Sequence, residues 1–230
     1  MRSTEVVEQE IKNDTKTEKE ENLKKIYSDP ILFEYNFKLN EELNYKVQTK
    51  VVKIIIQNGE EKEDILSSSG ILSYKGLLKD KDNDGTIVEL TSKIFNEEIG
   101  DYEVVNISQI IVKKNGECSS GGFTKFSDKP IKINDNWTYK IESAIKKITF
   151  LDIIKYKNID VGKFKIETLE EEGKNMNENE QFRVNDNGTY YFDFKNGKFV
   201  KLDFIVEVIY ENIRDDIKKI NKTFISTEII

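Results

Sequence analysis

The fold prediction starts from Phe37-Lys-Leu-Asn-Glu-Glu-Leu-Asn-Tyr-Lys-Val-Gln-Thr-Lys-Val-Val-Lys-Ile54, because a related stretch follows it: Ile131-Lys-Ile-Asn-Asp-Asn-Trp-Thr-Tyr-Lys-Ile-Glu-Ser-Ala-Ile-Lys-Lys-Ile148. The two align without a gap, and most unmatched pairs are conservative. A second pair of phrases follows in the same order, Asp82-Asn-Asp-Gly-Thr86 and Asn185-Asp-Asn-Gly-Thr189. Two such anchors indicate an internal duplication. The alternative is a chance likeness of amphipathic strands in a chain rich in lysine and isoleucine.

Apolar and polar residues alternate from Leu43 to Val51, which is the period of a half-buried β-strand. Further strands are predicted over residues 71–78, 86–95, 102–114, 137–150, 161–170, 189–194, 199–213 and 223–230. Four pairs of residues that tolerate positive φ indicate tight hairpin turns: Asn58-Gly59, Asp84-Gly85, Asn187-Gly188 and Asn196-Gly197.

These patterns predict an all-β fold made of two similar antiparallel β lobes. The first repeat is expected over residues 31–126 and the second over residues 127–230. The two could form one continuous curved sheet or a two-sheet sandwich. Residues 1–30 are expected to be a polar tail, disordered or a frayed helix, because few apolar positions precede Pro30. The tail could be a solvated end or a tether to a membrane anchor.

Composition narrows the classes of function. The chain has 43 acidic and 36 basic residues, so its net charge of −7 argues against a generic binder of the nucleic-acid backbone. It has no histidine, which removes the commonest general base and metal ligand. Cys118 is the only cysteine, so an intrachain disulfide and a thiolate zinc cluster are excluded. No catalytic, cofactor-binding or metal-binding residue is predicted, and we expect a protein that is not an enzyme.

No apolar run approaches the length of a membrane span, and no apolar signal core follows Met1. We therefore expect either a cytoplasmic protein or an extracytoplasmic one whose leader is absent from this sequence.

The segment Asp128-Lys-Pro-Ile-Lys-Ile-Asn-Asp-Asn-Trp137 resembles a phrase of uncharacterised bacterial envelope proteins and lipoproteins, where it opens the second of two β repeats. The run Gly188-Thr-Tyr-Tyr-Phe-Asp-Phe-Lys-Asn-Gly197 resembles a hairpin of the same proteins. This chain departs from them in having Asn134 where the phrase usually has glycine, and it lacks a lipobox cysteine. More distantly, the layout is similar to the half-barrels of lipoprotein carriers. The resemblance implies an envelope location and a ligand-holding sheet, but no catalytic residue.

The leading hypothesis is a non-catalytic binding or structural module of the cell envelope, which holds an apolar ligand or a protein partner. Membrane contact would occur only through an anchor absent from this chain, and no nucleic-acid partner is expected. The alternatives are a carboxylate-based enzyme acting on polysaccharide and a calcium-stabilised, adhesion-type module. A lined apolar cavity would favour the first hypothesis, and a cleft with two carboxylates about 5 to 10 Å apart would favour the enzyme.

The calcium alternative rests on Asp80, Asp82 and Asp84, which fit the first ligand positions of a calcium loop and precede Gly85. The position of the bidentate glutamate is occupied by Thr91, and the flanking pattern is that of strands. The favoured interpretation is therefore a polar hairpin tip.

We expect that millimolar calcium neither releases heat on titration nor raises the melting temperature of the purified protein. Even weak calcium sites bind in that concentration range, and a ligand that binds the native state stabilises it. A clear rise in melting temperature with calcium, absent with magnesium, would contradict the hairpin-tip interpretation.

Overall fold

The computed structural model describes residues 27–80, 84–118, 123–141, 144–170, 172–174, 180–212 and 217–230. These residues form eleven strands of one antiparallel sheet, so the all-β prediction is confirmed. None of the described residues forms an α-helix, and no membrane-spanning helix occurs among them. The strands are β1 (Glu42–Gln57), β2 (Glu60–Asp80), β3 (Gly85–Asn96), β4 (Asp101–Lys113), β5 (Asn136–Ile141), β6 (Ala144–Tyr156), β7 (Ile159–Glu170), β8 (Glu172–Lys174), β9 (Glu180–Asp193), β10 (Lys198–Asn212) and β11 (Ile217–Ile229).

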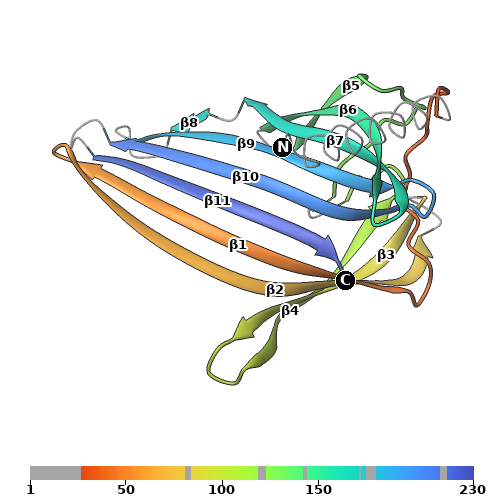
Figure 1. Cartoon of the computed structure of the whole chain (residues 1–230), viewed down its shortest axis with the longest axis horizontal. Coiled ribbons are helices and arrows are strands. Elements are labelled where there is room, and N and C mark those ends of the chain that lie inside the picture. The colour runs from red at the N-terminus through yellow and green to blue at the C-terminus, as the bar shows by residue number, and fades with distance from the viewer. Residues whose placement is uncertain are drawn as a thin grey trace, which may run out of the picture.

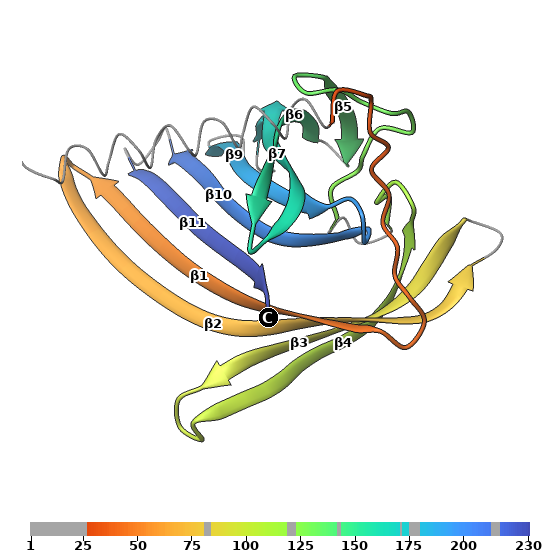
Figure 2. The same ribbon diagram turned by 45° about the vertical axis from the view of Figure 1, so that its right-hand side comes forward.

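The sheet is continuous and curved, so of the two arrangements left open it adopts the single sheet (Figures 1 and 2). The order of its strands is β4-β3-β2-β1-β11-β10-β9-β7-β6-β5. The short strand β8 is not part of this order and pairs with β9. Each half of the chain is thus a meander that contributes one side of the sheet. The halves meet where β1 pairs with β11, for example Tyr45 with Ile229.

The backbone repeats itself at the start of each half, as the aligned stretches predict. Asn40 and Asn134 both have positive φ, of 61° and 76°. Each lies in a four-residue turn closed by a backbone hydrogen bond, Glu41 N to Lys38 O and Asp135 N to Lys132 O. Asparagine suits both positions because its short polar side chain tolerates the left-handed region better than most residues.

The equivalence extends through the next strands. Leu43 pairs with Tyr74 in β1 and β2, and the aligned Trp137 pairs with Ile148 in β5 and β6. Both second strands then carry a bulge at the same place, between Gly76 and Leu78 and between Phe150 and Asp152. A shared bulge is a specific backbone feature, so it supports a common origin of β1–β3 and β5–β7.

The predicted match of the second pair of phrases, which aligns Gly85 with Gly188, is wrong. Gly85 begins β3, whereas Gly188 lies inside β9 opposite Phe204. The Asn187-Gly188 pair therefore makes no hairpin turn. A Cβ atom at Gly188 would lie 2.3 Å from Cδ2 of Phe204, so glycine is needed there for close approach rather than for turning.

Several strand boundaries were also predicted incorrectly; for example, β9 begins at Glu180 and not at residue 189, and β11 begins at Ile217 and not at residue 223. Residues 137–150 form a hairpin, β5 and β6, in which Ile141 pairs with Ala144. Strand β2 begins at Glu60, in a polar stretch whose exposed side chains give no inward-outward pattern. The turns at Asn58-Gly59 and Asn196-Gly197 are confirmed by the positive φ of both glycines. The predicted repeat boundary between residues 126 and 127 falls between β4 and β5, and it stays a prediction. Residues 1–26 of the predicted tail lie outside the described residues.

The core lies on one face of the sheet, here called the inner face, against residues 27–40, here called the strap (red in Figures 1 and 2). Phe33, Tyr35 and Phe37 alternate along the strap and are all buried. The ring centroid of Phe33 lies within 5.7 Å of those of Phe126, Phe150, Phe164 and Phe194. Most of these contacts are edge-to-face, the geometry that ring quadrupoles favour. The strap therefore ties the first meander to the second.

Trp137 faces the core as predicted but is half-buried rather than fully buried, and it packs against Phe126 and Phe164. Its indole N–H donates to the carbonyl oxygen of Lys125 at 2.8 Å. The edge position of β5 explains the partial exposure, because no further strand covers it within the described residues.

Replacing Phe33 with Ala should lower the free energy of unfolding by about 3 to 5 kcal/mol, the cost of removing a buried ring and leaving a cavity. The neighbouring Leu32 is 42% exposed, so Leu32→Ala should cost less than about 1 kcal/mol. Urea unfolding of both variants measures the difference. Equal losses for the two would show that the strap is not the centre of the core.

The start of the strap is held by Asp160, at the tip of the β6–β7 hairpin. Its Oδ2 accepts hydrogen bonds from Tyr27 Oη at 2.8 Å and Lys195 Nζ at 2.9 Å, and its Oδ1 pairs with Lys155 Nζ at 2.5 Å. Burial raises the pKa of this carboxyl, but the hydrogen bonds from Lys155, Lys195 and Tyr27 together lower it to about 2.

Asp160→Asn should destabilise the protein by about 1 kcal/mol near pH 7, the scale of a partly exposed charged hydrogen-bond network. A lowered native pKa means that the carboxylate stabilises the fold above about pH 4, and that this contribution is lost as the pH falls toward about 2. Melting curves of wild type and variant across this range should therefore converge at the acidic end. Asp29→Asn, an exposed change on the strap, is the control and should leave the melting temperature near that of wild type at pH 7.

Candidate functional site

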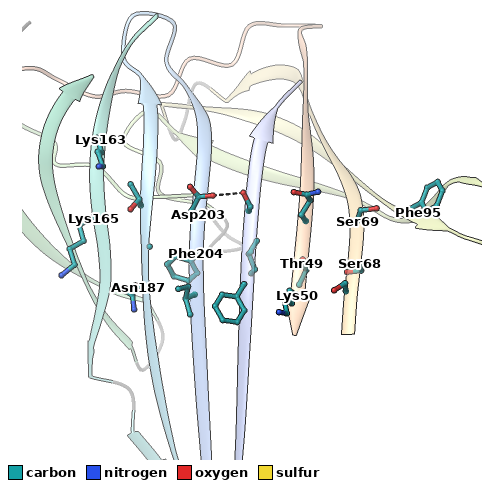
Figure 3. A pocket seen from close by; sticks show the side chains of 18 of the residues that line it. Thr49, Lys50, Ser68, Ser69, Phe95, Lys163, Lys165, Asn187, Asp203 and Phe204 are labelled. Atoms are coloured by element: carbon teal, nitrogen blue, oxygen red, sulfur yellow. Dashed lines mark hydrogen bonds between the residues drawn. The ribbon is translucent and has the colours of Figure 1, made fainter. Parts of the chain in front are cut away.

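The outer face of the sheet, opposite the aromatic core, carries a groove of about 1040 Å³ (Figure 3). It crosses six strands from β2 through β1, β11, β10 and β9 to β7, and β3 forms one end of it. Residues of neighbouring strands that pair directly point to the same face, so the register of the sheet fixes which side chains line the groove.

One transverse row of the groove is polar. Its members pair in succession across the sheet: Ser69, Gln48, Ser226, Asp203, Thr189 and Lys165. Every side chain in this row can donate or accept a hydrogen bond. The row therefore offers a continuous line of polar groups to a ligand that lies across the strands.

The adjacent row on the same face lies two residues away along each strand, and it combines apolar groups with a cation. It runs through Ser67, Lys50, Phe224, Ile205 and Asn187. Phe224 and Ile205 are 37% and 38% exposed, although both are large and apolar. Partly exposed apolar side chains inside a concavity mark a surface that gains from being covered.

The two ends of the groove differ in chemistry. Lys163 and Lys165 of β7 lie at one end, and Phe95 of β3 lies at the other (Figure 3). Lys165 pairs with Glu167 at 3.1 Å, whereas Lys50 and Lys163 have no ion-pair partner among the described residues. The groove thus presents two ammonium groups beside its apolar centre, Lys50 and Lys163, of which Lys163 lies opposite Asp152 of β6 in the sheet.

The carboxylate of Asp203 is already committed. It accepts a hydrogen bond from Ser226 Oγ at 2.7 Å and pairs with Lys201 Nζ at 2.8 Å. The hydrogen bond with Asp203 raises the pKa of Lys201. Asp203 and Glu97 are the only acidic residues among the described side chains that line the groove. The groove therefore does not favour the carboxylate pair that the enzyme alternative requires.

The predicted calcium loop is only partly described. Asp80 ends β2, and the carboxylate of Asp84 pairs with Lys114 at 2.9 Å. Asp82 lies outside the described residues, so the calcium hypothesis stays a prediction. Across the described part of the chain, no three residues of types His, Cys, Asp or Glu are grouped as a metal site would need.

Sequence reasoning did not single out the residues of this groove. Some of them lie in the quoted phrases at residues 37–54 and 185–189, but those phrases indicated strands and turns and not a binding surface, and lysine and asparagine are not distinctive in a chain so rich in both. The signal that could have found them is alternation: Phe224 and Ile205 are large apolar residues at the polar phase of their strands. Recognising them as neighbours also requires the pairing of β10 with β11, which alternation alone does not supply.

No protein-family model matches this chain, and no curated protein matches it. Among solved structures, the chain is similar to a DUF1329 family protein from Desulfovibrio piger, with 13% sequence identity and a TM-score of 0.14. The match covers 77% of this chain and 83% of that chain. With so low a TM-score, this likeness transfers neither fold nor function.

Proposed function

We propose that this protein is a non-catalytic binding module whose outer groove holds an elongated ligand with an apolar part and an anionic group. The observation that carries the proposal is the pair of parallel rows, one of polar side chains and one with Phe224 and Ile205 at its centre. A ligand lying across the strands would meet both rows at once.

The apolar part of the ligand is inferred from the partly exposed apolar side chains that line the groove. Covering the remaining surface of Phe224, Ile205 and Phe95 removes apolar area from water, at roughly 25 cal/mol per Å². The groove is within the size range of small-molecule sites, although it is open rather than enclosed. Affinity would therefore depend on contacts spread along its length.

The anionic group follows from the lysines. Lys50 and Lys163 flank the apolar centre, and neither is neutralised by a described carboxylate. An ammonium group binds carboxylate, sulfonate or phosphate oxygens through charge-assisted hydrogen bonds. The two acidic residues of the groove repel an anionic ligand less than two free carboxylates would, because Asp203 is paired with Lys201.

An envelope location is part of the proposal. It rests on the resemblance of residues 128–137 and 188–197 to segments of bacterial envelope proteins. No feature of the groove itself indicates a cellular compartment. The enzyme alternative stays a prediction; of the two carboxylates that line the described groove, Asp203 is already paired with Lys201.

The proposal can be tested with anilinonaphthalene sulfonate, a dye with aromatic rings and one sulfonate. We expect saturable binding that weakens about tenfold in Phe224→Ser, equal to about 1.4 kcal/mol. The double variant Lys50→Gln and Lys163→Gln should bind more weakly and lose most of the salt dependence, because it removes both free cations. Fluorescence titration at two salt concentrations measures both effects.

The matched control is Leu66→Ser. Leu66 is 50% exposed and lies on the inner face of β2, because it pairs with Val51 of β1. It should leave dye binding unchanged. Equal loss in Leu66→Ser and Phe224→Ser, or none in either, would overturn the assignment of the ligand to the outer groove.

A further inference from the structure

Within the part of the chain that the structure describes, the sheet ends in two open edges. There, strand β4 has only β3 beside it, and strand β5 has only β6. Among the described residues, the outer side of β4 is covered only near Val112, which pairs with Cys118. The rest of each edge presents backbone donors and acceptors that can pair with another strand.

The edge at β4 is unusually apolar for an exposed strand. Val104, Val105 and Ile107 are 53%, 55% and 62% exposed, and the β3–β4 hairpin that carries them projects away from the body of the sheet (Figure 2). No proline or lysine interrupts the strand from Asp101 to Val112. A bulge at Val105, where the register with β3 shifts, and the charged side chains of Asp101 and Glu103 near the start of the strand are the protective features of this edge within the described residues.

The two edges carry opposite charge. Residues 97–112, which hold the turn before β4 and most of β4, have four acidic and no basic side chains. Residues 129–141, which hold β5 and the segment before it, have three lysines and one acidic side chain. Lys129, Lys132 and Lys140 beside the outer strand are exposed, and their ammonium groups have no ion-pair partner among the described residues.

We propose that the acidic β4 edge of one copy of this chain docks against the basic β5 edge of a second copy, which extends the sheet from one molecule to the next. Parallel pairing of like edges would place Asp101 and Glu103 near their own counterparts, or Lys140 near its own, and like charges at an interface are repulsive. The unlike pairing removes this repulsion and covers Val104 and Ile107. Because the two surfaces differ, the contact is heterologous and can recur along an open-ended array.

The length of β5 limits the strength of the contact. Only six residues are available in that strand, so the interface should be small and the association weak. Exposed charges are screened within about 10 Å at 0.1 M salt, so the association should be strongest at low ionic strength.

Sedimentation of the 26.8 kDa chain tests this. At low salt the weight-average mass should rise with protein concentration beyond that of a dimer, and at high salt it should fall toward that of the monomer. The variant Glu103→Lys with Ile107→Lys blocks the first edge, and Lys132→Glu with Lys140→Glu blocks the second. Each variant alone should sediment as a monomer, whereas an equimolar mixture should associate again, because each variant brings the intact edge that the other lacks.

Two further variants control for net charge and folding. Glu61→Lys and Lys53→Glu change charge on exposed side chains of β2 and β1, away from both edges, and should associate as wild type does. A wild type that stays monomeric at low salt and high concentration would overturn the proposal. So would dimers of the β5-edge variant by itself, because they would show that two β4 edges pair with each other.

Discussion

The packing of the strap aromatics against the inner face is the interaction on which the rest of the structure depends. A single curved sheet has no second sheet to cover its apolar side, so the rings of Phe33, Tyr35 and Phe37 take that role. The same rings reach β6, β7 and β9, which belong to the second half of the chain. The backbone makes room for them, since a Cβ atom at Gly162 would lie 2.6 Å from the Phe33 ring.

The groove exists only because the two halves share a sheet. Its rows begin on β2 and β1 of the first meander and continue over β11, β10 and β9 of the second. Neither half presents both the free Lys50 and the apolar Phe224, which lie opposite each other across the joining strands. The duplicated parts, β1–β3 and β5–β7, supply both ends of the groove, and its centre lies on β9, β10 and β11, which the repeat does not relate.

Much of the fold could be predicted from alternation and turn chemistry, because both act locally. The strand at Leu43 to Val51, the turn at Asn196-Gly197 and the matched turns at Asn40 and Asn134 follow from them. The error at Gly188 has a physical cause: glycine serves both turns and close contacts, and only the neighbouring Phe204 distinguishes the two. The groove could not be predicted, because it depends on the order of strands far apart in the chain.

The pairing of Tyr45 with Ile229 joins residues near the two ends of the described chain. A nascent chain leaving the ribosome therefore cannot complete the sheet until its final strand has emerged. Until then β1 remains an open edge with no partner on that side, and its inner-face residues have no neighbour across the seam. Such non-local pairing favours slow folding and exposes the half-made sheet to aggregation.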